Sequence, residues 1–315
     1  MPFPVAGSPE NHPQYSGLLI PQIWSPRILE KFYHFSVLEH IANTHYEGEI
    51  RNQGDKVHIR LRPDITIRDH VAGQRLSDFD RPVPGTVELD IDRGKSWNFL
   101  VDDVNQAQAD YDYMLDWTEE AAESMNEVIN EIVLQEVPAD VHADNQGDAA
   151  GAVTSSFNLG SVGSPLAITK ENVMDILADT HVVLSEQKVP ERDRWMTIPP
   201  WFKGLIMQSD LRNALVTGND QEMLRKGHLG NLSGFDLFES NQLLVVEDAS
   251  ASQNVTNILA GHKSALTFAS QLTNSRVIEH PEYWGVFCQG LNVFGFEPIK
   301  PDALALIYGH RSVAE

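Results

Sequence analysis

The twelve histidines of this 315-residue chain are the first candidates for chemistry, because a neutral imidazole ring is a common metal ligand. His34, His40 and His45 lie close together in the sequence. Their spacing is neither His-x-x-x-His nor His-Glu-x-x-His, the spacings that place two rings on one face of a helix. His58 and His70 fall in a segment that we interpret as a loop. We therefore interpret the histidines as surface or interface residues and predict no metal site.

The candidate nucleophiles lack the neighbours that would activate them. Ser155 and Ser161 lie in a stretch rich in Gly, Ala and Ser, with no histidine close in sequence and no Gly-x-Ser-x-Gly motif. Cys288 is the single cysteine and stands in an apolar segment, so we expect a small buried side chain and no intrachain disulfide. Gly227–Gly234 is glycine-rich but lacks the Lys-Ser/Thr pair of a phosphate loop. The sequence predicts no catalytic residue and no cofactor.

Carboxylates are the remaining candidates, and they gather on one long predicted helix, Val104 to Val137. Its apolar residues recur every three or four positions, and no Pro or Gly interrupts it before Pro138. At 1.5 Å per residue the helix would be about 45–50 Å long. No Lys or Arg occurs between Ser96 and Thr169, and the polar side carries Asp112, Asp116, Glu119, Glu120, Glu123, Glu127 and Glu131. Acids spread this evenly are typical of a solvated face, and the alternative is a cation site.

A change to twofold periodicity predicts two strands, one before and one after a long loop. Apolar residues alternate with basic ones over 57–62 and with acidic ones over 87–92. If the strands pair antiparallel, the basic row faces the acidic row and ion pairs help to fix the register. Between them, Asp69 to Gly85 is rich in Gly, Pro and Asp and has too few apolar residues to fold against its own subunit. The bases of this extended loop include Arg60, Arg62, Arg68 and Arg75.

The rest of the chain predicts a second region that mixes helices and strands. Because these elements do not alternate as regular βαβ units, the pattern predicts an α+β fold. The expected elements are a helix capped by Thr169, a strand at Trp195–Ile198, a helix opened by Pro199-Pro200, a strand-like segment at Phe235–Val246 and an amphipathic segment at Ala265–Leu272.

Composition and charge limit the function classes further. Lys plus Arg is 23 and Asp plus Glu is 45, which gives a formal net charge of −22. A chain this acidic is repelled by phosphate backbones, so general nucleic-acid binding is excluded. No apolar run reaches the roughly 18 residues of a membrane helix. The segment Met1–Ser16 has four prolines and no Lys or Arg, so we expect neither a signal peptide nor a transit peptide, and a soluble protein made in the cytoplasm.

Charge segregation is the strongest functional signal of the sequence. One chain carries a protruding loop in which bases outnumber the acids Asp55, Asp64 and Asp69, and a long helix whose only charges are acidic and which has no internal counter-charges. A loop that meets a helix face of another copy forms a heterologous contact, which propagates into rings or closed shells. We therefore expect a subunit interface in which Arg60, Arg62, Arg68 and Arg75 face the acids Asp112, Asp116, Glu119, Glu123 and Glu127 of a neighbouring copy.

The order of these segments resembles a tailed-bacteriophage major capsid protein of the Johnson fold, which herpesvirus capsids and encapsulins share. The resemblance covers nearly the whole chain, and its main segments are Gly54–Ile59, Asp64–Asp69, Asn98–Asp103, Gly261–Leu266 and Val293–Phe296. It implies an N-terminal arm and short helix (1–47), an extended loop (48–100), a peripheral domain (101–149 and 269–299) with the spine helix 104–137, and an axial domain (150–268 and 300–315).

The same resemblance implies a function and partners. The chain would assemble into hexamers and pentamers of an icosahedral shell around double-stranded DNA, be located in the virion and be made in the host cytoplasm. About 25 residues precede the first predicted helix, so a separate scaffolding protein is expected, with a portal and a decoration protein as further expected partners. Residues 57–94 contain no Lys, so the covalent cross-link that some relatives form through a loop lysine is not expected.

Two alternatives remain open at this stage. An encapsulin-like compartment has the same fold but encloses enzyme cargo, and packaged DNA would distinguish the two. A soluble enzyme with a cation site along the acidic helix would instead be a monomer or a small oligomer with metal-dependent activity. Since each catalytic motif is incomplete, the sequence favours a structural protein that is not an enzyme.

Overall fold

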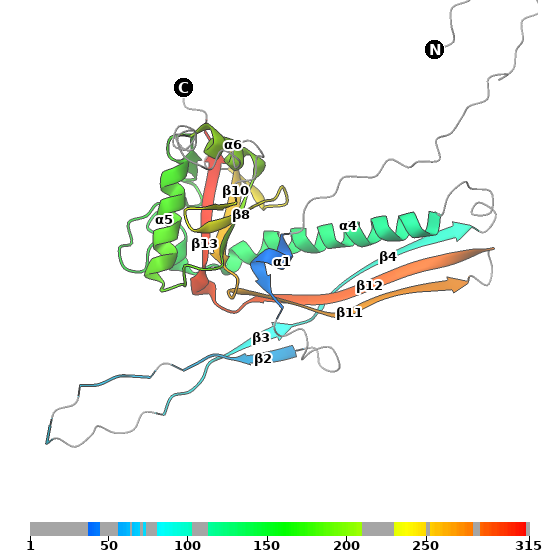
Figure 1. The fold of residues 1–315 in the computed structure, drawn as a ribbon, viewed down its shortest axis with the longest axis horizontal. Coiled ribbons are helices and arrows are strands. Elements are labelled where there is room, and N and C mark those ends of the chain that lie inside the picture. The colour runs from blue at the N-terminus through cyan, green and yellow to red at the C-terminus, as the bar shows by residue number, and fades with distance from the viewer. Residues whose placement is uncertain are drawn as a thin grey trace, which may run out of the picture.

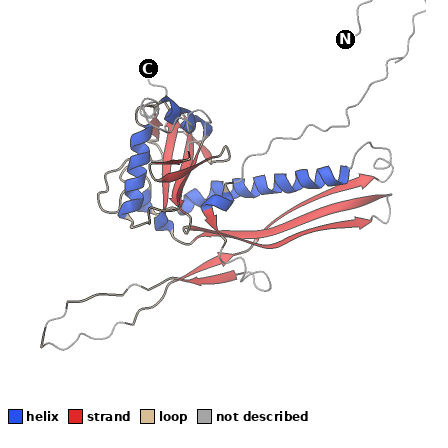
Figure 2. Cartoon of the chain, viewed as in Figure 1, coloured by secondary structure: helices blue, strands red, loops and turns tan. Residues whose placement is uncertain are grey.

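The computed structural model describes residues 37–44, 56–63, 65–69, 72–73, 81–102, 113–209, 230–249, 253–279 and 284–312. Two sheets, one long helix and a separate two-stranded ladder organise these residues (Figures 1 and 2). No helix in the described part is long and apolar enough to cross a membrane.

A four-stranded sheet and the helix α4 (Tyr113–Glu136) form the elongated half of the molecule (Figure 1). The strand order is β1 (Ala42–Asn43), β11 (Leu266–Glu279), β12 (Gly285–Pro298) and β4 (Arg93–Asp102). The last three pair antiparallel, and β1 joins the edge in parallel. α4 packs along β4 and β12, which confirms the predicted long helix over its described part. Residues 103–112, with Asp112, lie outside the described residues.

A seven-stranded sheet forms the second half, with α5 (Val173–Glu186) and α6 (Pro200–Gln208) packed on it (Figure 2). Its order is β5 (Leu166–Ile168), β13 (Leu304–Arg311), β10 (Gln253–His262), β6 (Arg194–Ile198), β8 (Phe235–Glu239) and β7 (Asn231–Leu232), and β9 (Val245–Asp248) pairs with β10. The short helices are α1 (Leu38–Ile41) and the 3₁₀ turns η1 (Val137–Asp140), η2 (Ala143–Asn145) and η3 (Pro301–Ala303).

Local sequence signals place the helices of this half. The Thr169 hydroxyl accepts a hydrogen bond from the Asn172 amide, and the Asn172 side chain accepts one from the Thr169 amide. This reciprocal pair satisfies two backbone donors just before α5, as expected for a capped helix start. Pro200 is the first residue of α6, where its missing N–H costs no helical hydrogen bond.

One hydrophobic core joins the two halves. It contains Val37 and Ile41 from the N-terminal segment, Val133 from α4, and Ile198 and Ile307 from the seven-stranded sheet. Because residues of both halves bury one another, the position of α4 depends on the N-terminal segment as well as on its own sheet.

The predicted hairpin strands are confirmed as β2 (Lys56–Arg60) and β3 (Thr86–Asp90), paired antiparallel. The Lys56 Nζ lies 3.0 Å from a carboxylate oxygen of Asp90, and the His58 Nδ1 lies 3.4 Å from one of Glu88. The expected contact between a basic and an acidic row therefore exists at this end. At the other end Arg60 lies opposite Thr86, so this register gives it no acidic partner.

The sequence interpretation of Ala265–Leu272 as an amphipathic segment missed its strand. These residues form the turn after β10 and the start of β11, which pairs with β1 on one side and β12 on the other. Residues 265–267 are all buried at this end of the strand, and continuous burial hides the twofold period of a strand. β4 belongs to the four-stranded sheet, whereas the predicted extended loop ran to residue 100.

Candidate subunit-interface surfaces

The predicted interface bases lie on a loop that stands apart from both large sheets (Figure 1). Arg60 ends β2, and Arg62 and Arg68 follow in the loop, all with exposed side chains. Within the described residues, Arg60 and Arg62 have no acid at ion-pair distance. Arg75 lies outside the described residues. The structure thus places a set of bases where another molecule can reach them.

The same loop exposes large apolar side chains. Ile65 is 72%, Ile67 94% and Val83 83% exposed. Residues 65–69 and 81–85 belong to no strand, so their backbones are not in a sheet ladder either. Exposed backbone next to exposed isoleucine is unfavourable in water and favours coverage by a partner.

The predicted acidic partners lie on α4, far from that loop. Asp116, Glu119 and Glu123 are exposed, Glu127 is half-buried, and Asp112 lies outside the described residues. Over the described ranges the first three have no base at ion-pair distance. The loop projects away from α4 (Figure 1), so one chain does not bring the two sets together.

A small separate core anchors the root of the loop. Ile59 of β2 and Leu89 of β3 pack with Ile91, Ala269 and Ile299, and all are buried. A side chain added at Gly295 of β12 would meet the carbonyl oxygen of Asp90 at 2.0 Å, so the loop root and the four-stranded sheet touch through their backbones. The root is therefore fixed, while residues 65–69 and 81–85 of the loop are exposed.

Charged groups surround this root. The Arg93 guanidinium lies 2.6 Å from a carboxylate oxygen of Glu136, which ties β4 to the end of α4, and also lies over the Phe296 ring at 4.4 Å. Burial raises the pKa of the Glu297 carboxyl above its ordinary value, and the nearby Asp140 and Asp90 raise it further. The balance of charge at the root is thus acidic.

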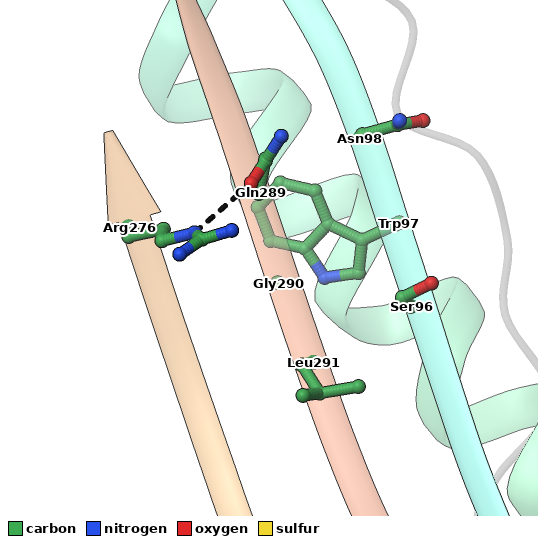
Figure 3. A pocket seen from close by; sticks show the side chains of 7 residues that line it. All are labelled: Ser96, Trp97, Asn98, Arg276, Gln289, Gly290 and Leu291. Atoms are coloured by element: carbon green, nitrogen blue, oxygen red, sulfur yellow. Dashed lines mark hydrogen bonds between the residues drawn. The ribbon is translucent and has the colours of Figure 1, made fainter. Parts of the chain in front are cut away.

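The second unpartnered surface is the face of the four-stranded sheet opposite α4. Paired residues of β4, β12 and β11 form a polar row across it: Asn98, Gln289 and Arg276, with the Arg276 Nε donating to the Gln289 Oε1 at 3.0 Å (Figure 3). A hollow of about 520 Å³ lies there, lined by Ser96, Trp97, Asn98, Arg276, Gln289, Gly290 and Leu291. Large apolar side chains on this face, Leu100, Ile278 and Leu291, are exposed.

The other face of this sheet is packed against α4 by aromatic rings. Trp97 stacks on Phe99 with ring centroids 5.3 Å apart, and Phe99 meets Trp117 of α4 edge to face at 5.7 Å. A side chain added at Gly290 would meet the Trp97 ring at 2.3 Å, so this glycine makes room for the indole. The packing with α4 is incomplete, because a hollow of about 320 Å³ remains on this face, lined by Trp97, Met114, Thr118, Ser275, Arg276, Val277 and Cys288.

Burial or hydrogen bonds within a turn account for the side chains that could take part in chemistry. Cys288 is 1% exposed, as predicted, and burial raises the pKa of its thiol, which makes it unreactive. His262 and Ser264 lie 2.8 Å apart, but the ring also accepts from the Ser264 amide, so this pair closes the turn between β10 and β11. Among the described residues, no group of three or more His, Cys, Asp or Glu side chains is arranged to hold a metal ion.

A helix along an elongated sheet, a second α+β half and a protruding two-stranded loop together define a bacteriophage capsid fold. No family model and no curated protein matches the chain. A structure from Mycobacterium phage Che8 matches with a TM-score of 0.73 and 24% identity, over 91% of this chain and 96% of that one. The capsid of cyanophage P-SCSP1u matches with a TM-score of 0.70 and 16% identity, over 93% and 94%.

A third match is the capsid of a native GTA particle, with a TM-score of 0.60 and 12% identity over 94% of this chain and 97% of that one. At this identity the likeness concerns the fold. The fold predicted from the order of segments is therefore confirmed.

Sequence reasoning found the charges of the interface surfaces but gave no role to their apolar residues. Ile65 and Ile67 stand in a segment expected to be exposed, and apolar residues in such a segment were a usable signal of a contact surface. The open sheet face had no such signal, because Ser96, Asn98 and Arg276 come from separate strands and meet only through the strand pairing.

Proposed function

We propose that this chain is a major capsid protein, which assembles into hexamers and pentamers of an icosahedral shell enclosing double-stranded DNA in a phage virion. The observation that carries the proposal is the match to capsid structures over more than nine-tenths of both chains. The acidic composition supports it, because a shell with a net charge of −22 per subunit repels packaged DNA instead of holding it.

Domain roles follow from this proposal. Residues 1–47 would form the arm and short helix, 48–100 the extended loop, 101–149 and 269–299 the peripheral domain, and 150–268 and 300–315 the axial domain. The plasticity that lets one chain occupy both hexamers and pentamers would reside in the loop and the arm.

The interface would join the loop of one copy to its neighbour. Arg60, Arg62, Arg68 and Arg75 would face the α4 acids Asp112, Asp116, Glu119, Glu123 and Glu127 of that neighbour. The exposed Ile65 and Ile67 support a larger, apolar contribution to the same contact. Exposed ion pairs contribute only about 0–1 kcal/mol each, so the charges would set orientation while burial supplies most of the affinity.

Further partners belong to the same proposal. A separate scaffolding protein, a portal and a decoration protein are the partners expected of such a shell. The chain would not act as an enzyme, and a structural role accords with the buried position of Cys288 and the raised pKa of its thiol.

Negative-stain microscopy of the purified protein tests the proposal. Closed icosahedral particles are expected, and nuclease-resistant DNA in particles from infected cells would exclude an encapsulin-like compartment filled with enzyme. A monomer or small oligomer with metal-dependent activity would instead support an enzyme and contradict the proposal.

A further inference from the structure

The two halves of the molecule meet at a joint that contains a buried polar relay. Asn130 of α4 is 1% exposed, and Gln242, in the turn between β8 and β9, is 8% exposed. The Asn130 side-chain amide donates to the Gln242 Oε1, and the Gln242 Nε2 donates to the Glu127 backbone oxygen at 3.0 Å. The relay thus links the helix of the elongated half directly to the seven-stranded sheet.

The N-terminal segment Val37–Asn43 completes the relay from a third direction. The Val37 amide donates to the Asn130 Oδ1 at 3.2 Å, so both polar atoms of this side chain are used. The His40 ring stacks on Phe238 of β8, with centroids 4.9 Å apart. Asn43 accepts from the Thr267 hydroxyl of β11 at 3.2 Å. One short segment therefore contacts α4, the seven-stranded sheet and the four-stranded sheet.

We infer that Asn130, Gln242 and the Val37–Asn43 segment set the angle between α4 and the seven-stranded sheet and thereby the curvature of the shell. The inference rests on the proposed function and goes beyond it. Hydrogen bonds are directional, and a buried amide left without a partner is costly, so only one relative orientation of the halves satisfies the relay. Apolar contacts in the surrounding core tolerate small rotations much better.

The consequence for assembly is a division of roles within the chain. A fixed joint makes each subunit present its loop and sheet face at one angle. The variation between hexamer and pentamer positions then lies in the exposed loop and in the part of the arm that precedes Val37. A joint without the relay would allow several angles and hence several particle diameters.

The test compares particle diameters for isosteric variants. Gln242→Met keeps the volume of the side chain but removes both of its joint hydrogen bonds. We expect it to form closed particles of several diameters, with the share at the wild-type diameter reduced by half or more in cryo-electron micrographs. The matched control is Gln135→Met, which removes an exposed bond between Gln135 and Glu131 on the same helix, and its particles should keep the wild-type diameter.

A second variant covers the case in which Gln242→Met does not fold. His40 is exposed, so His40→Ala removes the stack on Phe238 without opening the core, and it should broaden the diameters to a smaller extent. If Gln242→Met folds, wild-type diameters for both variants overturn the inference. If Gln242→Met does not fold, wild-type diameters for His40→Ala alone overturn it. If the wild-type chain itself forms no particles, the proposed function fails, and that outcome is distinct from uniform particles of all variants.

Discussion

Replacing Ile65 and Ile67 by Ser should abolish assembly while leaving the subunit folded. The side chains are 72% and 94% exposed in one chain, so the fold gains little from them. Full burial of an isoleucine contributes about 1.5–3 kcal/mol, so covering both at these exposures contributes about 2.5–5 kcal/mol per subunit. At about 1.4 kcal/mol per tenfold change, the double variant weakens the contact by roughly 60- to 4,000-fold.

The assay measures folding and assembly separately. Thermal unfolding of the unassembled subunit should be unchanged, and particle yield on a sucrose gradient should fall below detection. Thr66→Ser is the matched control, since it removes one methyl group from the residue between the two isoleucines and should assemble normally. Wild-type particle yield from the double variant would refute the reasoning that apolar burial at this loop holds the shell together.

Three other changes probe charge, packing and protonation. Arg68→Glu should reduce particle yield most at low salt, because salt screens exposed charges. A neutral Arg68→Gln should be tolerated, because an exposed ion pair contributes only about 0–1 kcal/mol. Equal yields of Arg68→Glu particles at every salt concentration would argue against an electrostatic contact. Leu134→Ala, at a site 1% exposed on α4, should lower the free energy of unfolding by about 2–5 kcal/mol in urea titrations, and a loss under about 1 kcal/mol would contradict the packing described. Burial, and secondly the charge of Arg194, holds the pKa of His181 below its ordinary value. Near the ordinary pKa of about 6.5 the unfolded chain therefore binds more protons than the folded chain, so stability is lost as the pH falls through that value. His181→Gln should flatten that acid-side loss in denaturant midpoints, and an unchanged pH profile would exclude His181 as its source.

The sequence predicted the local elements of this fold because their signals are local. The α4 stripe, the proline at the start of α6 and the alternation in β2 and β3 each lie within a few residues, whereas the helix cap expected at Thr169 lies at Asn172. The start of β11 was missed because residues 265–267 are all buried, which removes the alternation that marks a strand.

The candidate surfaces were predictable only in part for the same reason. The excess of bases in residues 51–75 and the acid-only face of α4 are visible in the sequence, and the structure places Arg60 and Glu119 on exposed positions. The joint relay was not predictable, since Val37, Asn130 and Gln242 are distant in the chain and meet only in the folded state. Isolated Asn and Gln residues carry no pattern until tertiary contacts bring them together.

A cryo-electron microscopy map of assembled particles at side-chain resolution measures the central interaction directly. It should show the isoleucines of each protruding hairpin covered by an adjacent subunit in both hexamers and pentamers. A map in which that hairpin lies against its own subunit, with Ile65 and Ile67 still facing solvent or the same chain, would contradict a shell built by exchange of loops between copies.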